Sequence, residues 1–239
     1  MTGRTTDAPR TPSGPAIYPV IHHLDAATTQ AQAGLAARCG AHGVFLINHD
    51  PHVHDEVLVE LGLHIRRELP GLRVGVNMLH APVLHAARAV LEAGLDMVWG
   101  DDCGVSSAGL TPRGEALRQF AAANPGVEVF ASVAFKYRPH EPLPGLAADT
   151  ARLAGFTPVT SGSATGRAPD LLKIEQMSRS GELPLAVASG MTPENVVDYA
   201  RLLSAILVAT GVSVDEHHFD AARLRQLVQA ASACDTVTQ

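Results

Sequence analysis

The sequence contains few aromatic residues, few basic residues and no long apolar run, and each shortage excludes a class of function. Aromatic side chains make up 4% of the 239 residues, too few for the stacking platforms that bind single-stranded nucleic acid. The 18 basic residues are outnumbered by 24 acidic ones, which gives a net charge of −6, so we expect no nucleic-acid partner. No stretch approaches the roughly 18 apolar residues of a membrane span, so we also expect no membrane partner.

Cysteine is scarce as well. The three cysteines, Cys39, Cys103 and Cys234, are odd in number and far apart, which argues against a disulfide framework and for a reducing, cytoplasmic setting. Residues 1–15 are rich in Thr, Pro, Gly and Arg and contain no apolar run. We therefore expect a flexible N-terminal tail and no secretory signal there, followed by one domain over residues 16–233.

Apolar residues make up 46% of the chain and are arranged as eight short runs. The runs span residues 16–21, 43–47, 73–77, 96–99, 128–134, 156–160, 185–188 and 205–209. Most of them lack polar alternation, which is typical of strands that are covered on both faces. A stretch with helical spacing follows each run, over residues 28–38, 54–68, 81–92, 111–123, 144–153, 169–178, 193–203 and 220–231. Pro near several starts and Gly or Pro after several ends support these helices.

Eight strands, each followed by a helix, predict a parallel sheet built from right-handed units. At this chain length a closed (β/α)8 barrel, the TIM barrel, is the simplest arrangement, and an open doubly wound sheet is the alternative. The functional side chains of such a barrel come from the loops at the carboxyl ends of its strands. The residues that follow the eight runs are therefore the candidates for a site.

The first two of these positions are rich in histidine. Neighbouring side chains of a strand point to opposite faces, so only one of His22 and His23 can face the barrel mouth. We take His23 as a candidate general acid or base, with a structural histidine as the alternative. His49, Asp50 and His52 follow the second run closely and are candidate ligands for a transition metal, with a polar loop that binds no metal as the alternative.

Polar residues also follow the next three runs. Asn77 can position a substrate hydroxyl or carbonyl group, or it can tie loops together. The pair Asp101-Asp102 is typical of a general base or of an oxygen-ligated magnesium ion, and also of loop hydrogen bonding; we take Asp102 as the catalytic candidate. Lys136 and Lys173 are the only lysines of the chain. Lys136 is a catalytic candidate because it can bind phosphate, form a Schiff base or shuttle a proton, and its alternative is a surface position.

Three loops combine glycine with hydroxyl side chains, a composition that suits anion binding. Residues 160–170 contain two glycines, four hydroxyl residues and an arginine before a helix, which favours an anion site over a flexible linker. The loops after the last two runs lie where TIM barrels usually bind phosphate. The candidate binding residues in the three loops are Ser163, Thr165, Gly166, Ser189, Gly190, Thr192, Thr210 and Gly211.

Four stretches at the ends of the first, third, sixth and seventh runs match motifs of a known family. They are His23-Leu24, Gly75-Val76-Asn77-Met78-Leu79, Thr160-Ser161-Gly162-Ser163-Ala164-Thr165-Gly166 and Ala188-Ser189-Gly190-Met191-Thr192-Pro193-Glu194-Asn195-Val196. On these residues the chain resembles the BtpA/SgcQ family over most of its length, from about residue 17 to 227. The last stretch also resembles the strand-seven phosphate loop of phosphoribosylanthranilate isomerase. The resemblance implies a TIM barrel of the ribulose-phosphate-binding type and no settled reaction.

The chain departs from both of these relatives. The resembled isomerase has a Cys after its first strand and an Asp after its fifth, where this chain has His22-His23 and Lys136. We therefore do not expect the activity of that isomerase. The BtpA family carries Pro-Leu-Pro-Gly after the first strand, where this chain has Asp25-Ala26-Ala27, so we expect a divergent branch.

Three functions remain open at this point. The first is an enzyme that acts on a small phosphorylated metabolite, a sugar phosphate or a nucleotide-derived phosphate, by acid/base isomerase or lyase chemistry. The second is a metal-dependent hydrolase, and the third is a non-catalytic assembly or regulatory barrel. The cofactor is unknown, and Mg2+ or another divalent metal ion is the candidate. Many barrels form homo-oligomers, but no motif of this sequence decides whether this one does.

Overall fold

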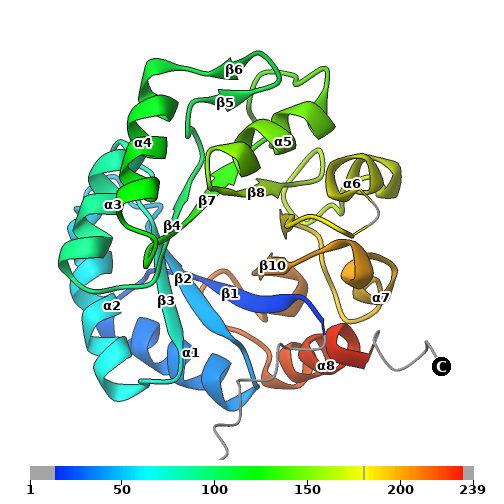
Figure 1. Ribbon diagram of the computed structural model, residues 1–239. Coiled ribbons are helices and arrows are strands. Elements are labelled where there is room, and N and C mark those ends of the chain that lie inside the picture. The colour runs from blue at the N-terminus through cyan, green and yellow to red at the C-terminus, as the bar shows by residue number, and fades with distance from the viewer. Residues whose placement is uncertain (1–13, 180, 234–239) are drawn as a thin grey trace, which may run out of the picture.

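Eight parallel strands close into a barrel at the centre of the molecule (Figure 1). The computed structural model describes residues 14–179 and 181–233. The barrel strands are β1 (Ala16–His22), β2 (Gly43–Ile47), β3 (Arg73–Asn77), β4 (Met97–Gly100), β7 (Glu128–Ser132), β8 (Thr157–Thr160), β9 (Ala186–Ala188) and β10 (Ala205–Val208). They neighbour one another in the order β1-β10-β9-β8-β7-β4-β3-β2, and β2 pairs with β1. The prediction of a (β/α)8 TIM barrel is therefore confirmed.

The helices surround the strands on the outside (Figure 1). They are α1 (Ala26–Arg38), α2 (Glu56–Glu68), α3 (Val83–Glu92), α4 (Pro112–Ala123), α5 (Pro144–Leu153), α6 (Leu171–Ser178), α7 (Val196–Tyr199) and α8 (Ala221–Ser232), with 3-10 turns η1 (Ala200–Leu202) and η2 (Thr210–Val212). Side-chain caps fix several starts. The Asp25 carboxylate accepts the Thr28 N–H at 2.7 Å at the start of α1, and Asp220 accepts two N–H groups at the start of α8, which satisfies donors that a helix start leaves unpaired.

The strands are buried on both faces, and alternate residues belong to two separate cores. On β1, Ile17 and Ile21 pack outward with the helices, while Tyr18 and Val20 point into the barrel. Phe45, Phe130 and other inward-pointing residues of the neighbouring strands fill that interior together with Tyr18. Because side chains alternate along a strand, the position that follows Val20 on the inner face is His22.

A polar network closes the amino-terminal end of the barrel. The Arg73 Nη1 group donates to the Tyr18 hydroxyl at 3.0 Å and to the Glu128 carboxylate at 2.9 Å. The Thr157 hydroxyl donates to the other oxygen of Glu128 at 2.9 Å. These four side chains come from β1, β3, β7 and β8, so the network ties both halves of the barrel together at the end away from the loops of interest.

The seventh helix is much shorter than the sequence predicts. The helical pattern covers residues 193–203, but α7 begins only at Val196 and gives way to the 3-10 turn η1. The cause is Asn195, whose side chain accepts the Thr192 N–H at 2.8 Å and donates to the Gly190 carbonyl at 2.9 Å. These local bonds compete with the first helical turn and hold the segment against the loop after β9.

A small hairpin in the loop after β4 is absent from the sequence prediction. It consists of β5 (Val105–Ser106) and β6 (Gly109–Leu110), which pair antiparallel and lie between α4 and α5, at the top of Figure 1. Strands of two residues are too short to show a period in the sequence. Gly109 has a φ of +110° at this turn, a conformation that favours glycine.

Some sequence expectations concern residues that the structure leaves out. The predicted tail over residues 1–15 lies outside the described residues except for its last two positions, and Cys234 lies outside them too. Cys39 and Cys103 are buried and have free thiols. Among the described helices, none is both long enough and apolar enough to cross a membrane.

Candidate active site

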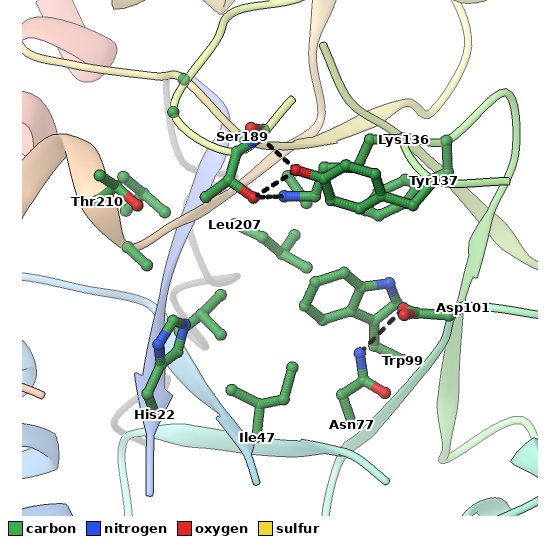
Figure 2. A pocket seen from close by; sticks show the side chains of 18 of the residues that line it. His22, Ile47, Asn77, Trp99, Asp101, Lys136, Tyr137, Ser189, Leu207 and Thr210 are labelled. Atoms are coloured by element: carbon green, nitrogen blue, oxygen red, sulfur yellow. Dashed lines mark hydrogen bonds between the residues drawn. The ribbon is translucent and has the colours of Figure 1, made fainter. Parts of the chain in front are cut away.

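A cavity of about 410 Å³ opens at the carboxyl ends of the barrel strands (Figure 2). Apolar side chains of the barrel interior form its base, among them Ile47, Trp99 and Leu207. Polar residues from the loops that follow the strands form its walls. TIM-barrel enzymes place their active sites at this end, so the cavity is the candidate site.

The strands β1 to β4 supply one half of the cavity wall. His22, His49, Asn77 and Asp101 line it, and each occupies the last inward-pointing position of its strand or the next one beyond. The Asn77 amide donates to the Asp101 carboxylate at 3.2 Å, which orients one carboxylate oxygen and leaves the other without a protein donor among the described residues. This half of the site can accept a proton.

The strands β7 to β10 supply the other half. Lys136 follows β7, and its Nζ donates to the Thr165 hydroxyl at 3.3 Å. The backbone N–H of Thr165 donates to the Tyr137 hydroxyl, also at 3.3 Å. The strands β1 and β7 lie opposite each other in the eight-stranded order, so His22 and Lys136 lie on opposite sides of the cavity (Figure 2).

Lys136 is an uncompensated positive charge in the cavity wall. No carboxylate lies within ion-pair distance of its Nζ in the described part of the chain, where its polar side-chain contact is Thr165. Burial lowers the pKa of the Lys136 amine below its ordinary value, although Tyr137 and Asp101 act in the opposite direction. The neighbouring cation of the wall, Arg138, is paired with Asp102 at 2.8 Å, a carboxylate that it shares with Arg113. Lys136 is therefore the cation of the wall that has no carboxylate partner among the described residues and can meet an anionic ligand.

Three loops pack so tightly beside Lys136 that only glycine fits at two positions. A Cβ on Gly190 would lie 2.0 Å from the Ala168 nitrogen, and a Cβ on Gly211 would lie 1.9 Å from the Met191 oxygen. Gly190 also has a φ of +70°. The Ser189 hydroxyl donates to the Ala164 carbonyl at 3.1 Å, so the loops after β8, β9 and β10 brace one another into a fixed wall.

Backbone donors in this wall are left without protein partners. The N–H groups of Gly166, Gly190 and Gly211 donate to no acceptor within residues 14–179 and 181–233, and all three glycines line the cavity. Unpaired backbone N–H groups attract anions. Together with Lys136 they give this side of the cavity hydrogen-bond donors and a positive charge, which suit an anionic ligand.

His22 is held in its neutral form. Burial, and next the neighbouring His49 ring, lowers the pKa of His22 to about 4. The two rings meet edge to face with their centroids 4.7 Å apart. The Nδ1 atom of His22 is buried and has no hydrogen-bond partner among the described residues, a condition that usually has a specific reason in a native protein.

Three backbone conformations near the cavity are strained. Ser189 has a φ of +151°, Tyr137 a φ of +61° and Ala134 a φ of +47°, values that side-chain-bearing residues rarely adopt. Ser189 and Tyr137 line the cavity, and Ala134 lies two residues before Lys136. Strain of this kind is found preferentially at ligand-binding sites.

Most of the residues proposed from the sequence do meet in the cavity. Its wall includes the proposed residues His49, Asn77, Lys136, Thr165, Gly166, Ser189, Gly190, Thr210 and Gly211. They come from loops that are far apart in the sequence and converge because every strand ends at the same rim. The feature of the sequence that identified these residues is their position directly after a predicted strand.

The two other proposed catalytic residues lie outside the cavity, and a sequence neighbour takes the place of each. His23 points to the outer face, where its Nδ1 lies 2.9 Å from the Thr29 hydroxyl, and His22 lines the cavity instead. Asp102 is bound by Arg113 and Arg138, each at 2.8 Å, and Asp101 lines the cavity instead. Burial acts to raise the pKa of Asp102, but the Gly104 N–H and the two arginines outweigh it and keep the pKa below its ordinary value.

Four further proposed residues also lie outside the cavity. Ser163 is exposed, and the Thr192 hydroxyl accepts the Glu194 N–H in a local turn. Asp50 accepts the N–H of His52 at 2.9 Å, so these two residues stabilise the loop after β2. Sequence reasoning missed Tyr137, and the positive φ that turns it toward Thr165 leaves no recognisable signal in the sequence.

Comparisons with known proteins give a fold and no family. No family model matches the sequence, and no curated protein matches it. Solved structures resemble the chain: phosphoribosyl anthranilate isomerase from Thermus thermophilus has a TM-score of 0.63 and 18% identity, over 91% of this chain and 98% of that one. Thiamine phosphate pyrophosphorylase from Pyrococcus furiosus has a TM-score of 0.63 and 13% identity, over 92% and 96%.

A third similar structure is the tryptophan synthase alpha chain from Legionella pneumophila, with a TM-score of 0.66 and 14% identity, over 94% of this chain and 93% of that one. At such identities the likeness shows the shared (β/α)8 architecture alone, because one barrel supports many unrelated chemistries.

Proposed function

We propose that this protein is an enzyme that acts on a small phosphorylated metabolite, a sugar phosphate or a nucleotide-derived phosphate, by acid/base chemistry of the isomerase or lyase type. The observation that carries the proposal is Lys136, a half-buried cation without a carboxylate partner, beside three loops whose glycine N–H groups are unpaired. A phosphate group satisfies both features at once, because it offers charge to the ammonium group and oxygen acceptors to the backbone.

Phosphate binding and proton transfer would be carried out by different residues of the cavity. With the phosphate held by Lys136, Gly190 and Gly211, the carbon skeleton of the substrate would extend across the cavity between Asp101 and His22, whose strands β4 and β1 flank the strands β7 to β10. There Asp101, oriented by Asn77, would take a proton from a carbon next to a carbonyl group. The neutral imidazole of His22 would hydrogen-bond the carbonyl oxygen as negative charge develops on it.

The resemblance to the BtpA/SgcQ family forms the finer part of this proposal. Three of the four motifs that carry it contribute residues to the cavity wall: Asn77, the pair Thr165-Gly166 and the pair Ser189-Gly190. The fourth motif contributes His23, which lies outside the wall. The activity of phosphoribosylanthranilate isomerase itself is not proposed, because this chain has His22 and Lys136 where the resembled isomerase has Cys and Asp.

A thermal-shift titration with inorganic phosphate, ribose 5-phosphate and ribulose 5-phosphate tests the phosphate site. A ligand at ~100 times its dissociation constant adds about 2.7 kcal/mol to the free energy of unfolding. We expect Lys136→Met to weaken binding by about 10-fold to 100-fold, because a charge-assisted hydrogen bond contributes about 1.5–3 kcal/mol. Arg88→Met is the matched control, since it removes an exposed positive charge of α3 far from the cavity lining.

Two results would separate the alternatives. An equal shift with ribose and ribose 5-phosphate, or equal affinity for wild type and Lys136→Met, would reject the phosphate site. Binding of the sugar phosphates without any exchange of their carbon-bound hydrogens with deuterated solvent, measured by NMR, would reject the proton transfer and favour a non-catalytic barrel.

A further inference from the structure

A second feature of the barrel mouth lies on the side away from Lys136. His22, His49 and Glu216 each offer a ligand atom, and these atoms lie within 4.8 Å of one another. Among residues 14–179 and 181–233 this is the one group of three or more histidine, cysteine or acidic side chains gathered closely enough to hold a metal ion. The phosphate proposal leaves His49 and Glu216 without a role.

The three side chains are positioned by three neighbouring segments of the barrel. β1 pairs with β10 on one side and with β2 on the other, so the loops after β10 and β2 flank the end of β1. His22 ends β1, opposite Ile47 of β2, and His49 is the next inward position after Ile47. Glu216 belongs to the loop after β10.

The loops that carry His49 and Glu216 are held by their own hydrogen bonds. Asn48 is buried, and its amide donates to the carbonyls of Asp50 and Val53 at 3.1 and 2.8 Å, which fixes the backbone beside His49. In the loop after β10, Asp215 accepts the N–H of His217 at 2.9 Å. The His217 ring in turn lies 3.1 Å from the carbonyl of His22, so Glu216 is anchored next to β1.

Two of the three distances between the ligand atoms are close to those found around a bound ion. One Glu216 oxygen lies 3.9 Å from the Nδ1 of His22 and 3.8 Å from the Nδ1 of His49. Ligand atoms ~2.1 Å from a tetrahedral ion stand about 3.4 Å apart. The two Glu216 separations therefore need to shorten by a few tenths of an ångström, and the remaining separation, between the two histidines and within 4.8 Å, by up to about 1.4 Å. Glu216 and His49 are partly exposed and free to make these movements.

The buried Nδ1 atom of His22 is the independent observation. It has no hydrogen-bond partner among the described residues, which is costly for a buried polar atom, and it faces the other two ligand atoms. A metal ion at this point would give the atom the partner it lacks.

We propose that His22, His49 and Glu216 form a binding site for one divalent transition-metal ion of the zinc type. Two imidazoles and one carboxylate suit Zn2+, Co2+ or Fe2+, whereas Mg2+ prefers oxygen ligands throughout. Three protein ligands leave coordination positions open, as in catalytic metal sites. His22 and His49 also line the main cavity, so those positions face the space that a ligand would occupy.

The site differs from the one expected from the sequence. That expectation grouped His49 with Asp50 and His52, which are its neighbours in one loop. The structure keeps His49 but joins it to residues 27 positions earlier and 167 positions later in the chain. The two sets share one residue, so variants of the others tell them apart.

Calorimetric titration of the tag-free, chelator-treated protein with Zn2+, Co2+ and Mg2+ tests the proposal. We expect one Zn2+ or Co2+ per chain, a visible Co2+ spectrum of low coordination number, and no Mg2+ binding. His22→Gln and Glu216→Gln are expected to weaken Zn2+ binding at least about 100-fold, more than the 10-fold to 100-fold loss of an outer partner. His52→Gln is the matched control and is expected to bind Zn2+ like wild type.

Three outcomes would overturn the site: Zn2+ binding no tighter than about 100 µM, equal losses in His52→Gln and Glu216→Gln, or unchanged binding in Glu216→Gln. Glu216 is exposed, so its variant is expected to fold even where His22→Gln does not, and circular dichroism checks both. Inorganic-phosphate binding by the Glu216→Gln protein is measured in parallel. If this variant loses Zn2+ binding but retains phosphate binding, the metal site and the phosphate site are independent of each other.

Discussion

Lys173 extends from α6 to the carbonyl oxygens of Ala134 and Ser161, at 2.6 and 2.9 Å. Ala134 follows β7 and Ser161 follows β8, and the Ser161 hydroxyl also accepts the Lys136 N–H at 2.8 Å. Burial lowers the pKa of Lys173 to about 8, and a neutral amine can still donate to both carbonyls. One lysine therefore supports the wall of the cavity, while the other presents its charge to the cavity itself.

The pKa of Lys173 predicts a pH dependence of stability. Between pH 8 and pH 10.5 the unfolded chain keeps the Lys173 proton that the folded chain has released, so the free energy of unfolding rises with pH across this window. Relative to Lys173→Met, we expect wild type to gain about 1–2 kcal/mol between pH 7.5 and pH 10, after allowance for solvent screening. Urea denaturation of both proteins measures the difference, and parallel curves would contradict the prediction.

At the scale of the elements, the first turn of α8 holds the loop after β10, which is part of the proposed phosphate site. Asp220 caps the helix by accepting the N–H groups of Ala222 and Arg223 at 2.8 and 3.1 Å. The Arg223 guanidinium then donates to the carbonyl of Gly211 at 3.1 Å and to Glu194 at the same distance. The cap thus fixes the residue that braces the loop after β10.

Removal of this cap has a defined cost. Asp220→Ala is expected to lower the free energy of unfolding by about 1 kcal/mol, whereas Asp220→Asn retains an oxygen acceptor and is expected to lose less than half of that. Urea denaturation gives both values from the shift in midpoint at constant slope. Equal losses in the two variants would show that the carboxylate charge, and not the hydrogen bond, is what matters at this position.

The elements were predictable from the sequence, whereas the orientation of the side chains at their ends was not. All eight strands coincide with apolar runs, because strands between a packed interior and a ring of helices have to be apolar throughout. Because both faces of each strand are buried, the sequence does not show which residues point into the barrel and which point toward the helices. Val20 and Ile21 are both apolar, so nothing in the sequence shows that His22 and not His23 follows the inner face, and Asp101 and Asp102 present the same ambiguity after Val98 and Trp99.

At the scale of the whole molecule, the two ends of the barrel have separate tasks. The Arg73–Glu128 network joins β1, β3, β7 and β8 at the amino-terminal end, and the cavity lies at the other end. TIM barrels commonly separate stability and function in this way. Changes at one end should therefore leave the other end intact.

A pair of variants tests this separation. Glu128→Ala leaves Arg73 half-buried without its carboxylate, so we expect a loss of about 1–2 kcal/mol in the free energy of unfolding and unchanged affinity for inorganic phosphate. Lys136→Met is expected to show the reverse, with weaker phosphate binding and near-wild-type stability. Urea denaturation and phosphate titration of both proteins make the comparison, and a Glu128→Ala protein with weakened phosphate binding would refute the separation.

The closed barrel also decides how copies of this chain can associate. Each barrel strand is hydrogen-bonded on both sides, so the barrel offers no free backbone to a strand from another molecule. Within the described residues, open strand edges belong only to the two-residue hairpin β5–β6, which is too short to template a continuous intermolecular sheet. A homo-oligomer of this protein would have to form through helix faces and loops, and the folded barrel is protected from the edge-to-edge growth that leads to fibrils.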